Sequence, residues 1–129
     1  MKRRNVLLGG PYEELVGFSR AVRVGPFVSV GGTAPIGDNG ETIGVGDARA
    51  QANRCFEIIQ NALEGAGASL SDVVRTRMML TDVSDFEAVI SVRKEFVREF
   101  KPVDTIVEVS RFVNPEWLIE VEADAVIPS

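Results

Sequence analysis

The stretch NALEGAGASLSDVVRTRMMLTDVSDFEAV, residues 61–89, changes its hydrophobic period twice, and these changes decide the fold. Its first residues continue a helical spacing of apolar side chains that Gly65 and Gly67 bring to an end. In residues 72–83 apolar and polar side chains then alternate, as they do in a β-strand. The sequence SDFE at residues 84–87 has the form of a capping box that opens a helix. The stretch therefore predicts a helix, a strand and a second helix in succession.

Upstream of this stretch, the sequence predicts a hairpin, a loop and the start of the first helix. The β-rich runs RAVRV and FVSVGG flank Gly25-Pro26, a pair typical of a tight turn. The glycine-rich residues 33–46 indicate a loop with a short strand at 42–45. The helix follows Asp47, which is expected to cap it. Its predicted buried stripe comprises Ala48, Ala52, Cys55, Phe56, Ile59, Leu63 and Ala66.

Downstream, the second helix is expected to run to about Lys101, because Pro102 disfavours helical geometry in the residue before it. Its predicted buried stripe comprises Phe86, Val89, Ile90, Phe96, Val97 and Phe100. Two further strands are expected, TIVEVSRF at residues 105–112 and LIEVEADAVI at residues 118–127. The order ββ-α-β-α-ββ predicts an α+β fold, a single domain over residues 1–129 with one mixed sheet and both helices on one face.

Composition excludes several classes of function. The 129 residues carry a net charge of -5 with scattered basic residues, which disfavours a nucleic-acid partner. No apolar run reaches the ~20 residues of a membrane helix, and the start of the chain lacks a signal-peptide core, so a cytoplasmic protein is expected. The chain has no histidine, which excludes histidine-based triads and histidine metal sites. We predict no metal and no cofactor, and we interpret Cys55 as a small core residue.

Two of the predicted strands have a charged side. Glu120, Glu122 and Asp124 alternate along the last strand, as Arg75 and Arg77 do along the strand of residues 72–83. This face is either solvated, with weak cross-strand ion pairs, or buried against copies of the same subunit. Apolar residues without an obvious partner favour the second interpretation: Leu118 and Val126 on the charged side, and Met78 and Leu80 on the other strand.

Three blocks of the sequence resemble a known family. GFSRAVRVGPFVSVGGTAP, the stretch at residues 61–89, and VEVSRF with IEVEADAV are similar to the Rid family of reactive-intermediate deaminases, also called the YjgF family. The resemblance runs from about Gly17 to Val126. It implies a chorismate-mutase-like fold, a homotrimer whose sheets form a central barrel, and three small-molecule clefts between subunits. It also implies the cofactor-free hydrolysis of an enamine or imine to a 2-keto acid and ammonia.

The resemblance also points to a missing group. Active members carry an arginine two residues after the proline that precedes the second-last strand, and its implied role is to hold the substrate carboxylate. Asp104 occupies that position here. Since the exchange replaces attraction by repulsion, we expect the usual 2-imino acids to bind poorly. Two functions stay open: a non-catalytic trimer that binds a metabolite or partner, and a hydrolase whose cationic or neutral substrate has no carboxylate.

Other positions of the implied site are partly kept. Glu120 matches the glutamate thought to position the attacking water, and Gly32 matches a glycine that lines the cleft. Phe18 stands where a tyrosine is common, and Ile90 replaces a polar residue. Arg111 is a candidate second clamp for the substrate. Structural alternatives accompany these roles: Glu120 pairing with Arg75 or Arg77, Asp104 capping a turn or a strand end, and Arg111 making an ion pair.

Overall fold

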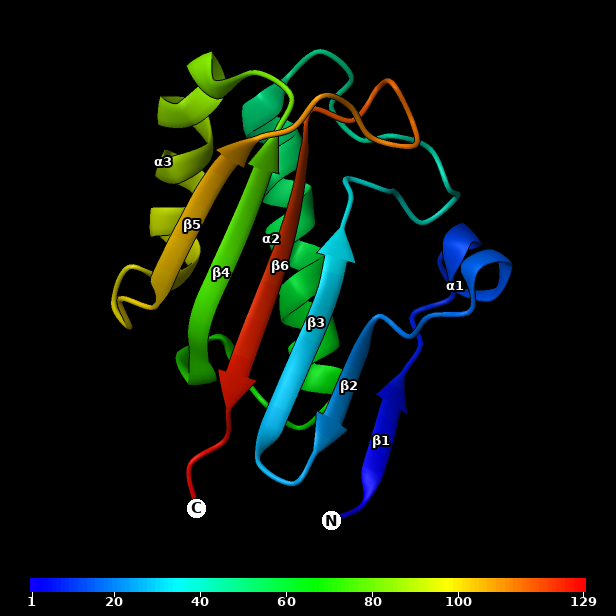
Figure 1. The fold of residues 1–129 in the computed structure, drawn as a ribbon, viewed down its shortest axis with the longest axis vertical. Coiled ribbons are helices and arrows are strands. Elements are labelled where there is room, and N and C mark those ends of the chain that lie inside the picture. The colour runs from blue at the N-terminus through cyan, green and yellow to red at the C-terminus, as the bar shows by residue number, and fades with distance from the viewer.

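The computed structural model describes residues 1–129 and has the predicted α+β architecture (Figure 1). Six strands form one sheet in the order β1-β2-β3-β6-β4-β5. The strands are β1 (Arg3–Val6), β2 (Ala21–Val24), β3 (Phe27–Thr33), β4 (Val73–Leu80), β5 (Val103–Glu108) and β6 (Ile119–Val126). The α-helices are α1 (Pro11–Val16), α2 (Ala48–Gly65) and α3 (Phe86–Val97), with short 3-10 turns at η1 (Leu70–Asp72) and η2 (Val83–Asp85).

The sheet is mixed, as its sequence pattern predicts. Neighbouring strands are antiparallel except β4 and β5, which pair in parallel because α3 carries the chain back between them. Helices α2 and α3 lie side by side behind the sheet and leave its other face uncovered (Figure 1). The last strand, β6, lies between β3 and β4 in the middle of the sheet.

The core lies between the helices and the covered face of the sheet. It contains alternate residues of the central strands and the predicted stripe of α2, including Cys55, whose thiol pKa is raised by burial. Met78 and Leu80 are fully buried in this core. The prediction that these two residues lack a partner was therefore wrong, because their side chains point toward the helices rather than toward the uncovered face.

Two N-terminal elements extend the predicted order. The edge strand β1 pairs with β2, and Pro11 opens the short helix α1. Gly17 ends α1 with φ 89°, a left-handed conformation that suits glycine. Sequence periodicity missed both elements, since β1 buries only Val6 and α1 is a helix of 6 residues. Together they carry the chain over one end of the sheet.

The ends of several elements differ from prediction. The predicted Asp47 cap of α2 is confirmed, with its side chain accepting a hydrogen bond from the Ala50 amide at 3.0 Å. The capping box at residues 84–87 is wrong, because Asp82 accepts the Ser84 amide at 2.9 Å and starts η2 instead. Helix α3 ends at Val97, not Lys101, and β5 ends four residues before Phe112. Between residues 33 and 46 only an isolated bridge, Ile36 to Thr42, forms instead of a strand.

The uncovered face of the sheet carries both charged and apolar side chains. Arg77 forms ion pairs with Glu122 at 3.5 Å and with Asp124 at 3.2 Å, and these groups are partly buried within one chain. Exposed apolar residues accompany them, namely Phe27, Val103, Val107 and Val126. None of the helices combines the length and hydropathy needed to cross a bilayer.

Candidate functional site

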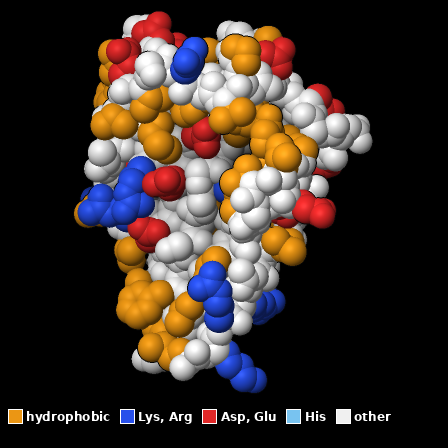
Figure 2. All heavy atoms as spheres, turned by 45° about the vertical axis from the view of Figure 1, so that its right-hand side comes forward, with side chains coloured by type: hydrophobic (Ala, Val, Ile, Leu, Met, Phe, Trp, Pro, Cys, Tyr) orange, Lys and Arg blue, Asp and Glu red, His pale blue; other side chains and the backbone are white.

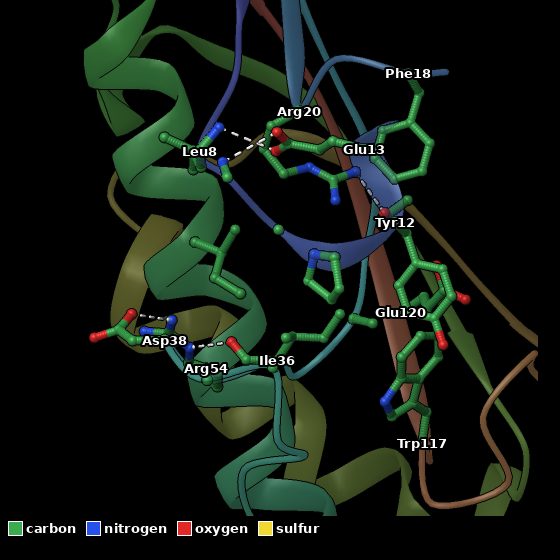
Figure 3. Close-up of a pocket in the computed structure, with 18 of the residues that line it drawn as sticks. Leu8, Tyr12, Glu13, Phe18, Arg20, Ile36, Asp38, Arg54, Trp117 and Glu120 are labelled. Carbon is green, nitrogen blue, oxygen red and sulfur yellow. Dashed lines mark hydrogen bonds and ion pairs between the residues drawn. The ribbon is translucent and has the colours of Figure 1, made fainter. Parts of the chain in front are cut away.

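A cavity of about 610 Å³ opens at the end of the sheet where β2, β3 and β6 approach α1 and α2. Figure 2 shows that side of the molecule, on which hydrophobic side chains border the recessed middle and acidic and basic groups are interspersed. Polar groups from distant parts of the chain line the cavity: Arg20 beside β2, Gly32 in β3 and Glu120 in β6. Figure 3 shows the side chains of Arg20 and Glu120 in this cavity. Its size lies within the range of small-molecule sites, roughly 300–1,000 Å³.

A double-glycine irregularity in β3 makes room for the charged groups. Val30 pairs with Ala123 but Thr33 pairs with Val121, so β3 carries an extra residue at this point. A Cβ atom on Gly32 would lie 2.9 Å from a Glu120 carboxylate oxygen, and one on Gly31 would lie 3.1 Å from Arg20 Nη2. Both charged side chains therefore pass close over this backbone, and any side chain at these two positions would crowd them.

Arg20 is one of two arginines that line the cavity, the other being Arg54. The Arg20 Nη2 donates a hydrogen bond to the Gly32 carbonyl at 2.5 Å, and its guanidinium carbon lies 5.2 Å from the Phe18 ring centre. Its Nε is buried without a hydrogen-bond partner. Burial lowers the pKa of the guanidinium, while nearby Glu13 and Glu120 oppose the shift. The group stays charged, because an arginine pKa begins far above neutrality.

Glu120 is the candidate acid or base. Burial raises the pKa of its carboxyl above the ordinary 4.5, Arg20 lowers it, and Glu122 adds to the rise. No ion pair within 4.0 Å fixes this carboxylate; Arg77 pairs with Glu122 and Asp124 instead, and Met79 lies opposite Glu120 across the ladder. A carboxyl with a raised pKa next to a cavity is a candidate for holding or transferring a proton.

The remaining walls are aromatic and apolar. Tyr12 and Trp117 meet edge to face with ring centres 5.6 Å apart. Trp117 is buried, and its indole Nε1 has no hydrogen-bond partner. Glu13 closes the inner end, where its two carboxylate oxygens accept the Leu8 and Gly9 amides at 3.0 Å each (Figure 3). These two hydrogen bonds tie α1 to the segment before it and so fix the cavity wall.

Three of the six predicted site residues meet in this cavity: Phe18, Gly32 and Glu120. The other three, Ile90, Asp104 and Arg111, do not line it in this chain. Ile90 packs against the core on α3. Arg111 is exposed beyond the end of β5 and forms no ion pair within one chain, contrary to its structural interpretation.

Asp104 points toward α3, where its carboxylate is already engaged. Thr76 Oγ1 donates to it at 2.6 Å, and Arg93 Nε lies 3.6 Å away. Arg93 also donates from Nε to Thr76 Oγ1 and from Nη2 to the Pro102 carbonyl, both at 2.8 Å. Asp104 is thus part of a filled polar cluster between sheet and helix, and neither a turn cap nor a solvated strand end.

Sequence reasoning missed Arg20, Tyr12 and Trp117 as parts of the site. Arg20 reads as an ordinary polar position of a strand, and Tyr12 lies in a helix too short to show a period. The one available signal was composition, because Trp117 is the only tryptophan and Tyr12 the only tyrosine of the chain. No group of three or more cysteine, aspartate or glutamate side chains is placed to hold a metal ion.

Comparisons with known proteins identify the family and agree with the fold. The family model described as Endoribonuclease L-PSP matches residues 12–127. A RutC family protein of Pyrococcus abyssi is 42% identical over 116 residues, 90% of this chain and 86% of that protein. A 3-aminoacrylate deaminase, RutC, of Acinetobacter baylyi is 33% identical over 125 residues, 97% of this chain and 98% of that one. The crystal structure of a YjgF-family protein from Mycobacterium tuberculosis has a TM-score of 0.88 and 41% identity, covering 98% of this chain and 100% of its own.

Proposed function

We propose a small-molecule function for this chain, which belongs to the Endoribonuclease L-PSP family, also called the Rid or YjgF family. In this proposal the protein is a homotrimer with one ligand-binding cleft at each subunit boundary. It lacks the standard hydrolysis of 2-imino acids, because Asp104 replaces the arginine that would hold the substrate carboxylate. Residues of the described cavity form one wall of each cleft.

The observation that carries the proposal is that the Asp104 carboxylate already has partners within the chain. This carboxylate accepts a hydrogen bond from Thr76 and forms an ion pair with Arg93. Arg93 also donates hydrogen bonds to Thr76 and to the Pro102 carbonyl, so this arginine already has three partners. The strand therefore offers no free cation for a substrate carboxylate. A bidentate arginine fixes both the position and the orientation of its partner, and poor positioning lowers a rate far more than a weak base does.

The uncovered sheet face supports the trimer. It carries exposed Phe27, Val107 and Val126 beside the half-buried ion pairs of Arg77, a mixture typical of a surface that another subunit covers. A closed threefold assembly would also cover exposed strand edges. Light scattering tests this part: we expect about 42 kDa, three times the 14.0 kDa of one chain, and a stable monomer at micromolar concentration would refute it.

The activity is tested by generating 2-aminoacrylate-type imines with an amino-acid oxidase and trapping the remaining imine with semicarbazide. We expect no acceleration by the wild type, with an arginine-bearing relative as the positive control. Asp104→Arg alone would place two cations together, so the gain-of-function variant combines it with Arg93→Gln. We expect this double variant to show measurable turnover. Wild-type turnover equal to that of the relative would show that the substrate is anchored elsewhere.

A second candidate is a hydrolase for a substrate without a carboxylate. The observation that favours it is the position of Glu120 in the cavity with its raised carboxyl pKa. Glu120 would take a proton from water as the hydroxyl oxygen bonds to the imine carbon and the C=N electron pair moves to the nitrogen, and it would return that proton to the nitrogen. It would then carry the hydroxyl proton to the nitrogen as the C–N bond breaks, which leaves a carbonyl product and ammonia. The Acinetobacter relative bears the name of a deaminase, which supports this reaction class. Release of ammonia from simple carboxylate-free imines, lost in Glu120→Gln, would establish it.

A further inference from the structure

The hydrogen-bonding groups of Arg20 are only partly used. A guanidinium has five N–H donors, and Arg20 uses one of them, from Nη2 to the Gly32 carbonyl. Its Nη1 makes no hydrogen bond and is not among the buried unpaired atoms, and Figure 3 shows the guanidinium directed into the cavity. An acceptor atom on a bound molecule would satisfy this donor. The cavity therefore offers an N–H donor to a bound molecule on the Arg20 side.

The charges around the cavity are nearly balanced before any ligand binds. Arg54 Nη2 forms an ion pair with Asp38 at 3.2 Å, so these two offset each other. Of the remaining charged groups, Arg20 is the one cation against Glu13 and Glu120. Glu13 accepts two backbone amides, but its negative charge remains and acts on Arg20, so one cation faces two anions. A carboxylate ligand would add a third anion beside Glu13 and Glu120, and an ammonium ligand has no acceptor atom for the Arg20 Nη1 donor.

We propose that the cavity binds an uncharged, planar, amide-like group, whose carbonyl oxygen accepts from Arg20 Nη1 and whose N–H donates to Glu120. This deepens the proposed function and rests on it, because it names the ligand class of the same cleft. Gly32 lies between the two recognition groups, since it contacts both Arg20 and Glu120. Arg20 is then a specificity-determining residue of the site.

The aromatic walls suit such a ligand. Tyr12, Phe18 and Trp117 present ring surfaces to the cavity, and a planar group with a short apolar substituent can lie against them. A neutral amide also has a smaller desolvation cost than either ion, so it enters an apolar-walled cavity more readily. Shape and charge thus select the same chemical class.

The only tryptophan of the protein lines the cavity, so its fluorescence reports binding directly. We would titrate the full chain in its native assembly at neutral pH with propionamide, propionate and propionamidine. These three probes share one shape and carry charges of zero, minus one and plus one. We expect propionamide to bind at least about tenfold more tightly than either ion, and to raise Tm accordingly. Equal or tighter binding of either ion, or no response to any probe in both measurements, would overturn the proposal.

Two variants test whether Arg20 and Glu120 cause the preference for propionamide. Glu120→Gln removes one anion while keeping the side-chain shape, so we expect propionate to gain on propionamide by several-fold. Arg20→Met should abolish propionamide binding, and Arg49→Met, which removes an exposed arginine outside the cavity, should leave all three affinities unchanged. Because Arg20 also bonds the sheet backbone, the Glu120→Gln result decides the matter if Arg20→Met does not fold. An unchanged ratio in Glu120→Gln would overturn the assigned contacts.

The probe titrations can fail or succeed independently of the experiments that test the proposed function. Light scattering and the imine assay test the assembly and the missing activity, and neither depends on which probe binds. A trimer without 2-imino acid turnover that prefers propionate would refute the ligand class alone. Turnover of 2-imino acids by a protein that still prefers propionamide would refute the proposed function alone.

Discussion

Arg20 and Arg93 are both held close to the core, but their surroundings differ. Arg93, with 14% of its side chain exposed, donates to Thr76 and to the Pro102 carbonyl and forms an ion pair with Asp104. Arg20 donates once, to a backbone carbonyl, and its Nε is buried without a partner. The first arginine joins a helix to the sheet. Arg20 still has N–H donors without a partner in the protein, and a ligand-binding group needs such donors.

The largest effect should come from Arg93→Met. Asp104, with 18% of its side chain exposed, would lose its counter-charge, and the Pro102 carbonyl would lose its donor. Because an unpaired, largely buried charge is strongly unfavourable, we expect the free energy of unfolding to fall by about 2–4 kcal/mol. Urea denaturation measures this. A loss below about 1 kcal/mol would show that the Arg93 cluster does not serve as a structural anchor.

A smaller effect is expected from Gly32→Ala. The new methyl would lie 2.9 Å from a Glu120 oxygen, and the flexible carboxylate would swing away at a cost of roughly 1 kcal/mol. Propionamide affinity should fall because Glu120 leaves its position. Gly10→Ala is the matched control, since its methyl would meet only a Glu13 oxygen at 3.9 Å. Equal behaviour of the two variants would remove Gly32 from the site.

The pH dependence of stability tests the pKa shift of Glu120. Burial raises the pKa of Glu120 in the folded state above 4.5, so the folded protein binds more protons there than the unfolded chain. Stability from this group is therefore present at low pH and declines as pH rises through and above that value. Glu120→Gln lacks the decline, so its Tm advantage over wild type should grow from pH 4 to pH 8. A constant difference would contradict the shift. The effect is modest, since the group is partly exposed.

The smallest effect belongs to Arg49→Met. Arg49 forms an ion pair with Glu95, and 54% and 53% of these two side chains are exposed. Solvent screens such an exposed pair. We expect a change within about 0.5 kcal/mol in the same urea experiment. This result fixes the baseline for an arginine that is neither buried nor in the cavity. If Arg49→Met lowered the free energy of unfolding as much as Arg93→Met, the greater structural importance assigned to Arg93 would be refuted.

Elements with a strong period were predictable from the sequence, and long-range polar contacts were not. The alternation in β4 and β6 and the helical stripe of α2 follow from the burial of one face. The partner of Asp104 could not be found in this way, because Arg93 is a typical surface residue of a helix until α3 packs against β5. Arg20 likewise becomes a site residue only where the glycines of β3 bring it near Glu120.

Half of the candidate residues that the family resemblance indicated lie in one cavity. Phe18, Gly32 and Glu120 lie on separate elements, so no local pattern brings them together. Asp104 and Arg111 fall outside this cavity in one chain, and the trimer proposal is what would bring a neighbouring copy to it. Light scattering thus bears on the site as well as on the assembly.

The central position of β6 has a consequence for synthesis on the ribosome. The strand is made after the other five strands of the sheet, yet it fills the gap between β3 and β4. Until it emerges, the nascent chain holds two half-sheets whose facing edges are unpaired and able to pair with other chains. A ribosome stalled before residue 119 would therefore display an aggregation-prone intermediate. Since Glu120 arrives on this strand, closure of the sheet and completion of the cavity are the same late event.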